Sequence, residues 1–325
     1  MSLRMPTPPR VFRVHGLCGR GARSGLGALT LAAAFLAALP GRTTAQDWDA
    51  VTVKTQEVAD GVYMLVGRGG NIGLSVGGDG VFVIDDQFAP LTPKILAAIR
   101  EISGEPVRFV FNTHWHGDHT GGNEEMGKAG ALLVAHDNVR VRLSMDQVLE
   151  RVGRPPTDVP AAPEDALPVV TFTEDITFHL NGDDLHAFHV AHAHTDGDAI
   201  IHFRRANVVH MGDTFFHGRF PFIDTASGGS IDGLIAAVGR ALAVMDADTR
   251  VIPGHGPLAT RADLRGYADA LKGMRKAVRR AMDRGMSLAE IQEARPIARW
   301  AAAWGQDREA EDNFVATLYS SLGGR

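Results

Sequence analysis

The segment NTHWHGDHTGG at residues 112–122 constrains this chain more than any other stretch. It places three histidines and one aspartate within six residues, directly after the apolar run VRFVF, which predicts a buried strand. Four polar side chains at the end of such a strand need partners, because burying unpaired polar groups is costly. His114 and His116 are spaced to reach one cation. Asp118 and His119 can turn toward a second. Imidazole and carboxylate are ligands that Zn²⁺ accepts, so the segment predicts a metal site.

The rest of the chain divides into two successive halves, each with strands followed by helices. Residues 51–85 hold short β-type runs broken by glycine, which predict an antiparallel meander. Two such halves favour two sheets packed face to face with helices outside. A proline-rich loop is expected at residues 154–168. Beyond the meander we expect strands at 107–111, 132–135, 169–172, 176–180, 185–190, 199–204, 208–211 and 250–252, and helices at 91–102, 138–149, 231–245, 260–284 and within 287–322.

The first 45 residues have the pattern of a secretory signal peptide. Six arginines and no acidic residue occur in the first 46 positions, and the apolar run LGALTLAAAFLAAL ends shortly before Thr43-Thr44-Ala45. A basic region, a short apolar run and a small-x-Ala ending is the order of such peptides. A retained membrane anchor is the alternative, but the run is short for ~30 Å of hydrocarbon. We therefore expect a signal peptide at 1–45, a periplasmic protein, and no stable membrane insertion after cleavage.

The chain that would remain after cleavage is acidic and has no cysteine. It carries 27 Lys or Arg and 38 Asp or Glu residues, which gives a net charge of −11. That excess of negative charge disfavours general binding to a phosphate backbone, so we expect a small-molecule substrate and no nucleic acid. Cys18 is the only cysteine and lies within the predicted signal peptide. The remainder therefore has neither a disulfide nor a thiolate ligand.

Three further motifs follow the histidine-rich segment. They are HTDGD at residues 194–198, MGDT at 211–214 and PGHGP at 253–257. With the His-x-His-x-Asp-His pattern, they resemble the metallo-β-lactamase superfamily across essentially the whole predicted core. The resemblance implies an α/β fold, a four-layer αββα sandwich. It implies one domain at 46–325, with a core at about 51–260 and C-terminal helices at about 260–322.

The resemblance also implies a site for two Zn²⁺ ions. Its ligands would be imidazoles and carboxylates, three for each ion and one shared: His114, His116 and His194 for the first ion, Asp118, His119 and His255 for the second, and Asp213 as the bridge. Asp198 resembles a group that orients a ligand imidazole through the other ring nitrogen.

Other histidines compete with this set. His189 and His192 compete with His194, since alternate residues on one strand, such as His192 and His194, point the same way. Only His194 is followed by Thr-Asp-Gly-Asp, so we choose it as the ligand. His210, three residues before the expected bridge, is assigned to packing. We expect ordinary structural roles for His179, His186 and His202.

The chemistry implied by the resemblance is hydrolysis of an activated acyl bond. Two cations lower the pKa of a shared water to about 7, and the bridging hydroxide, oriented by Asp118, would attack a carbonyl. Familiar zinc β-lactamases use a cysteine where this chain has Asp213, which places the chain closer to the glyoxalase II and lactonase branches. We predict a β-lactamase-like zinc hydrolase of a cyclic amide or ester. A lactonase or a glyoxalase II-like thioesterase is the alternative.

Two alternatives come from other functional classes of protein. One is a mononuclear iron-dependent sulfur oxygenase on the same scaffold, and the other is a binder of metal or ligand without turnover. A complete set of seven ligands with a bridging aspartate disfavours the inert binder. Metal identity and stoichiometry would separate the oxygenase, because it uses one iron.

The residues that line the pocket must determine the substrate specificity. Residues 213–222 are rich in phenylalanine, and these rings either pack the acyl portion of a substrate or belong to the core. Arg219 or His217 could meet a carboxylate there. Trp115 and the glycine-containing residues 71–73 could form other walls. A basic helical stretch is either a substrate contact or a solvated surface: Lys272, Arg275, Lys276, Arg279 and Arg280.

Overall fold

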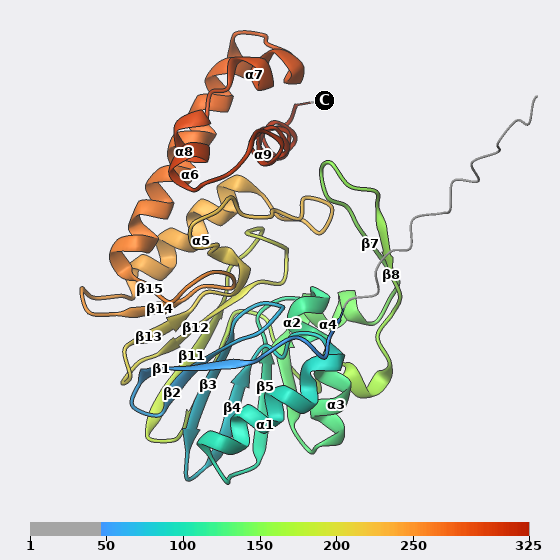
Figure 1. Ribbon diagram of the computed structural model, residues 1–325, viewed down its shortest axis with the longest axis vertical. Helices are drawn as coiled ribbons and strands as arrows, with labels where there is room; N and C mark the ends of the chain where they lie inside the picture. The colour runs from blue at the N-terminus through green and yellow to red at the C-terminus, as the bar shows by residue number, and fades with distance from the viewer. Residues whose placement is uncertain (1–46, 325) are drawn as a thin grey trace, which may run out of the picture. The chain divides into compact units, whose positions relative to one another are not determined.

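Two mixed β-sheets stack face to face in the computed structural model, which describes residues 47–324 (Figure 1). The first sheet has its four N-terminal strands antiparallel and the others parallel. In spatial order its strands are β1 (Lys54–Ala59), β2 (Val62–Val66), β3 (Ile72–Gly77), β4 (Gly80–Ile84), β5 (Val107–Asn112), β6 (Leu132–His136) and β9 (Val170–Phe172).

The second sheet is antiparallel apart from one parallel pair in its second half. Its strands, again in spatial order, are β10 (Asp175–Leu180), β11 (Asp183–His189), β12 (Ala199–Phe203), β13 (Val208–His210), β14 (Arg250–Ile252) and β15 (Ala259–Thr260). A separate hairpin is formed by β7 (Gln147–Leu149) and β8 (Thr157–Val159).

Helices cover the outer face of each sheet, as the predicted four-layer αββα sandwich requires. Side chains of the N-terminal helices pack on the first sheet, and those of α5 and α6 pack on the second. The α-helices are α1 (Thr92–Ile102), α2 (Gly117–Thr120), α3 (Asn123–Lys128), α4 (Asp137–Leu143), α5 (Ile231–Ala243), α6 (Arg261–Asp283), α7 (Leu288–Ala294), α8 (Ala298–Ala303) and α9 (Arg308–Ser321). Three 3-10 turns are η1 (Ala89–Leu91), η2 (Glu164–Ala166) and η3 (Gly212–Thr214).

Burial along the strands follows their position in the sandwich. All residues of β4 are buried, because one face meets the second sheet and the other meets α1. The edge strand β1 is mostly exposed. The helix α6 starts with a capping box, in which the side chains of Thr260 and Asp263 bond to each other's backbone N–H. The most apolar strands therefore lie in the interior of the sandwich, where packing on both faces holds their ends in place.

One predicted helix is too long. The helix expected at 138–149 ends at Leu143, and its last three residues form β7 instead. The Gln147 side chain donates to the carbonyl oxygen of Arg142 (3.2 Å) and so satisfies the helix end. Pairing of 147–149 with 157–159 then favours the extended backbone over the local helical pattern. The expected loop at 154–168 accordingly contains β8 and η2.

Between residues 47 and 324, no helix combines the length and the apolar character needed to cross a membrane. The predicted signal peptide lies outside the described residues.

Phe82 tests the packing between the sheets. Its fully buried ring lies 4.8 Å from that of Phe178, across the sandwich, between ring centroids. We expect Phe82→Ala to lower the free energy of unfolding by about 3–5 kcal/mol, because the cavity it leaves cannot be refilled. Urea unfolding followed by tryptophan fluorescence measures the loss. Leu132→Ala, at a side chain 48% exposed, is the control and should change stability by at most about 0.5 kcal/mol. Equal effects of the two substitutions would contradict this packing.

Candidate metal centre

Strand ends from both sheets converge on one edge of the sandwich. In the first sheet, β4 ends before Asp85, and β5 ends at Asn112 before the histidine-rich segment. In the second, β13 leads into η3, which carries Asp213, and β14 leads to His255. Carboxyl ends of neighbouring parallel strands lie at the same edge, so residues distant in the chain become neighbours there.

The structure brings the seven predicted ligand residues together. They form two groups within which one potential ligand atom per residue lies within 4.8 Å of the others: His114, His116, His194 and Asp213 in the first, and Asp118, His119 and His255 in the second. In the first group, Nδ1 of His116 lies 2.9 Å from Nε2 of His194. All four side chains of this group are buried.

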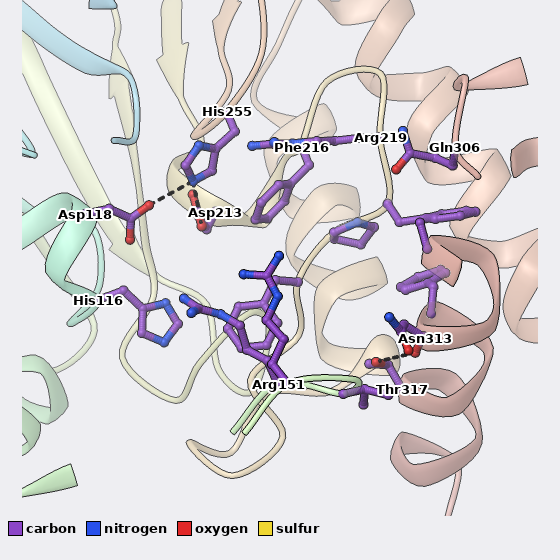
Figure 2. Close-up of a pocket in the computed structure, with 17 residues that line it drawn as sticks. His116, Asp118, Arg151, Asp213, Phe216, Arg219, His255, Gln306, Asn313 and Thr317 are labelled. Carbon is purple, nitrogen blue, oxygen red and sulfur yellow. Dashed lines mark hydrogen bonds and ion pairs between the residues drawn. The ribbon is translucent and has the colours of Figure 1, made fainter. Parts of the chain in front are cut away.

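Asp213 belongs to the first group and also lies close to the second. Its Oδ2 is 3.6 Å from Nε2 of His194 in the first group and 3.3 Å from Nε2 of His255 in the second. Its Oδ1 is 3.1 Å from Nε2 of His119. Asp118 also approaches His255, with Oδ2 3.3 Å from Nε2 of that ring (Figure 2). Asp213 is therefore placed to contact an ion in either group.

Four histidines are oriented by a hydrogen bond to the ring nitrogen that is not the potential metal ligand. They are the three histidines of the first group and His119 of the second. This second partner fixes the ring and its tautomer. The pairs are His119 Nδ1 with Asp85 Oδ2 (2.7 Å), His114 Nδ1 with Thr113 Oγ1 (3.0 Å), His116 Nε2 with Asp224 Oδ2 (2.9 Å) and His194 Nδ1 with the Phe222 carbonyl oxygen (2.8 Å).

Asp198 does not orient the imidazole of His194 through a ring nitrogen, as the sequence analysis expected. Its carboxylate instead accepts bonds from the backbone N–H groups of His194 (2.6 Å) and Thr195 (2.8 Å). The reason is local: residues 194–198 form a tight turn that brings the carboxylate back onto its own backbone. Asp198 therefore shapes the loop that presents His194, and the carbonyl oxygen of Phe222 orients the ring.

Three buried polar atoms at this centre have no hydrogen-bond partner: Nε2 of His114, Nε2 of His119 and Oδ1 of Asp213. The last two face each other but lack the alignment of a hydrogen bond. Buried polar atoms without partners cost free energy, and cations bound in the two groups would satisfy all three. Imidazole and carboxylate atoms are the donors that zinc accepts, so this set fits such an ion.

The charge distribution of the centre also favours cations. Burial lowers the pKa of His116 to about 4 and holds that of His114 well below its usual range, so both rings are neutral and able to bind metal. Burial alone would raise the pKa of Asp213, but the adjacent His255 and His119 hold it well below the ordinary value. Burial opposes charge on His255 as well, yet Asp213 and Asp118 raise its pKa to about 9. The carboxylates thus attract positive charge into a buried site.

Glycines allow the backbone to approach this centre. At Gly70, a Cβ atom would overlap the imidazole of His119, and the Gly70 N–H donates to the Asp118 carbonyl oxygen (3.0 Å). At Gly254, a Cβ would overlap the carboxylate of Asp213. Side chains at either position would displace a residue of the centre.

The competing histidines lie elsewhere. His189 stacks on His136 with 3.8 Å between ring centroids, and His192 bonds through Nδ1 to the Gly228 carbonyl oxygen (3.0 Å). His210 is buried, with Nε2 3.1 Å from the Asn71 carbonyl oxygen, which agrees with its predicted packing role. The three histidines expected to be structural, His179, His186 and His202, belong to neither metal-binding group.

A cavity of about 420 Å³ opens above the centre (Figure 2). The aromatic segment 213–222 divides between core and cavity. Phe215 is buried in the core, whereas three other rings line the cavity: Phe216, Phe220 and Phe222. Arg219 also lines it, but His217 does not and bonds to the Pro257 carbonyl oxygen (2.9 Å).

The far wall of the cavity comes from residues that the sequence analysis did not single out. Asn313 and Thr317 of α9 line it, together with Arg151 from the loop between β7 and β8 (Figure 2). The basic stretch of α6 does not line it; there Arg275 pairs with Asp232.

Asp85 and Asp224 were also missed. The first has a signal in the sequence, since an Asp-Asp pair directly follows the apolar run GVFVI. No pattern in the sequence marks Asp224.

A family model described as the metallo-β-lactamase superfamily matches residues 65–255. The chain belongs to this superfamily. Solved structures agree on the fold. A metallo-β-lactamase from Pontibacter korlensis superposes with a TM-score of 0.56 at 18% identity, covering 68% of this chain and 99% of that one. A double mutant of the sec-alkyl sulfatase PisA1 gives a TM-score of 0.63 at 17% identity, covering 84% of this chain and 50% of that one.

Curated relatives within the superfamily are distant. A hydroxyacylglutathione hydrolase of Polaromonas sp. is 28% identical over 168 residues, which is 51% of this chain and 55% of that protein. One from Erythrobacter litoralis is 29% identical over 114 residues, which is 35% of this chain and 36% of that protein. The chain thus spans between about a third and about half of the length of these relatives.

Gly70→Ala tests whether the second group holds an ion. The added methyl group must push the His119 ring away from its partner Asp85, so we expect the number of metal ions bound per chain to fall by about one, with the fold kept. Metal analysis by mass spectrometry and far-UV circular dichroism measure both. Gly266→Ala is the matched control, because a Cβ there meets open space on α6. If Gly70→Ala binds as much zinc as the control, the placement of His119 in the centre is wrong.

Proposed function

We propose that this protein is a binuclear zinc hydrolase that cleaves an acyl bond in a small molecule, with a cyclic amide or ester as its substrate. The position of Asp213 carries the proposal. A buried carboxylate within 4 Å of imidazoles from both groups needs positive charge on two sides. Three orphaned polar atoms point to the same need.

The proposed assignment of ligands follows the two groups. His114, His116 and His194 would hold one zinc, Asp118, His119 and His255 would hold the other, and Asp213 is within reach of both groups. When bound, the two ions supply Lewis acidity and lower the pKa of a water molecule to about 7.

Asp118 is the proposed catalytic residue. It is the most exposed side chain of the seven at 26%, and it lines the cavity where a substrate would enter. Burial alone would raise its pKa, but the neighbouring His119 and His255 lower it well below the usual range, so the carboxylate is ionised at neutral pH. An ionised Oδ2 beside His255 can accept a hydrogen bond from water, orient it toward a carbonyl and hold its proton.

A thioester is the second candidate substrate. Its support is the activity for which the curated relatives are named, hydroxyacylglutathione hydrolase, together with the presence of Asp213 and the lack of any cysteine in residues 46–325. Against a mononuclear iron oxygenase stands the second group, because one ion would leave Asp118, His119 and His255 without a function.

A substrate panel tests this proposal. Residues 46–325 loaded with zinc are given a chromogenic cephalosporin, an aryl lactone and an acyl thioester. We expect kcat/KM of about 10⁴ M⁻¹s⁻¹ or more for at least one of them, the low end of ordinary enzyme efficiency. Preference for the thioester would select the second candidate, and turnover of none would contradict acyl hydrolysis.

Asp118→Asn is the variant that tests the catalytic assignment within this panel. The amide cannot hold the proton, so we expect kcat to fall by about 10²- to 10⁴-fold. Asp60→Asn, in the exposed turn after β1, is the matched control and should keep full activity. Full activity of Asp118→Asn with both metals bound would remove Asp118 from the mechanism.

Export is part of the proposed role, and it rests on the pattern of residues 1–45. Expressed in full in a Gram-negative host, the protein should accumulate in the periplasm with Gln46 as its first residue, as N-terminal sequencing would report. An intact Met1 in the cytoplasmic fraction would contradict export.

A further inference from the structure

Arginines line the cavity on both of its walls. Arg151 and Arg154 come from the loop at residues 150–156 between β7 and β8, and Arg219 comes from the aromatic segment. None of the three forms an ion pair with a carboxylate of the described part of the chain, although other arginines do. Their N–H donors are therefore available to a ligand.

Two of these guanidinium groups stack on rings that themselves contact the metal centre. Arg219 lies 5.4 Å from the ring centroid of Phe216, which stacks on His255 of the second group (5.1 Å between centroids). Arg151 lies 5.2 Å from the ring centroid of Phe222, which stacks on His116 of the first group (5.6 Å). In each metal-binding group, one aromatic ring thus lies between a histidine of the group and an arginine.

The loop that carries Arg151 is held close to the C-terminal helices. Gly153 has a positive φ of 78°, and a Cβ atom there would overlap the side chain of Asn313 on α9. Figure 1 shows the hairpin of β7 and β8 extending from the sandwich toward α9. In Figure 2, Arg151 and Arg219 enter the cavity from different elements and both lie near the metal centre.

The cavity is positively charged in a protein that is otherwise acidic. Among the described residues that line it, the carboxylates are Asp118 and Asp213, which the proposed metals would more than neutralise. Three arginines remain unbalanced there, whereas residues 46–325 carry a net charge of −11. A concave site of one sign concentrates ligands of the other.

We propose that the substrate carries two anionic groups, one bound by Arg219 and the other by Arg151 with Arg154, and that the bond to be cleaved lies between them. This inference rests on the proposed hydrolase function. The guanidinium fork suits carboxylate, sulfate or phosphate alike, so the shared property is a planar or tetrahedral oxyanion at each end of the molecule. The three phenylalanine rings that line the same cavity fit an apolar body.

Binding of aromatic sulfonates tests the two subsites without any reaction. Sulfonates are poor zinc ligands, so naphthalene-2,6-disulfonate, naphthalene-2-sulfonate and neutral 2-naphthalenemethanol report on the arginines. Isothermal titration calorimetry with the zinc-loaded protein should give the disulfonate an affinity about tenfold or more above that of the monosulfonate, with the neutral alcohol weakest. Raising the salt concentration should weaken the disulfonate most.

Charge-matched variants locate the subsites. Arg219→Gln and the double variant Arg151→Gln/Arg154→Gln should each reduce disulfonate affinity about tenfold, to the level of the monosulfonate. Arg280→Gln and the double variant Arg265→Gln/Arg280→Gln, at exposed positions of α6 outside the cavity, are the controls and should change nothing. Equal affinity for all three probes, or equal losses in variants and controls, would overturn the proposal.

Hydrolysis assays separate this inference from the proposed function. A sulfonated aryl mono-ester of a dicarboxylic acid, with one anion on each side of the ester bond, is compared with the neutral aryl ester of the corresponding monocarboxylic acid, and the dianionic ester should have a kcat/KM at least tenfold higher. If neither ester is cleaved but the binding results hold, the hydrolase proposal fails and the anion subsites stand. If both are cleaved equally, the subsites are wrong and the hydrolase proposal stands.

Discussion

Asp213 is a buried carboxylate surrounded by imidazoles. The arrangement of residues at this edge of the sandwich depends on stabilising its negative charge. Removing a carboxylate from water is costly unless positive charge surrounds it. Here His119 and His255 lie 3.1 and 3.3 Å from its oxygens. A second carboxylate, Asp85, bonds to the far side of His119 at 2.7 Å. Asp85, the His119 imidazole and Asp213 therefore follow one another in a chain of close contacts. The negative charge of these carboxylates favours the binding of cations at the centre.

The two sheets make this arrangement possible because each contributes part of it. Asp85 has a positive φ of 62°, a strained conformation that points its carboxylate at Thr113 and His119. From the other sheet, η3 and the loop after β14 deliver Asp213 and His255. Packing between the sheets fixes these strand ends relative to one another, so the free energy of the core is what holds the centre preorganised.

The sequence predicted the inner part of the site and little of what surrounds it. The ligand residues lie in short motifs at strand ends, where polar residues interrupt apolar runs, and the sheets follow from the same runs. Asp224 gave no such signal, since only the folded chain brings it 2.9 Å from His116. Likewise, the wall formed by α9 and Arg151 depends on how helices pack, which local periodicity does not determine. The helix expected at 138–149 ends at Leu143 because strand pairing across a hairpin outweighed local preference in its last residues.

The most direct measurement is anomalous diffraction from crystals grown with the metal that the protein binds as purified, recorded at the zinc and iron absorption edges. Our account predicts two zinc peaks a few ångströms apart with Asp213 between them. One should lie among His114, His116 and His194, and the other among Asp118, His119 and His255. A single peak, or a signal at the iron edge alone, would contradict a binuclear zinc centre.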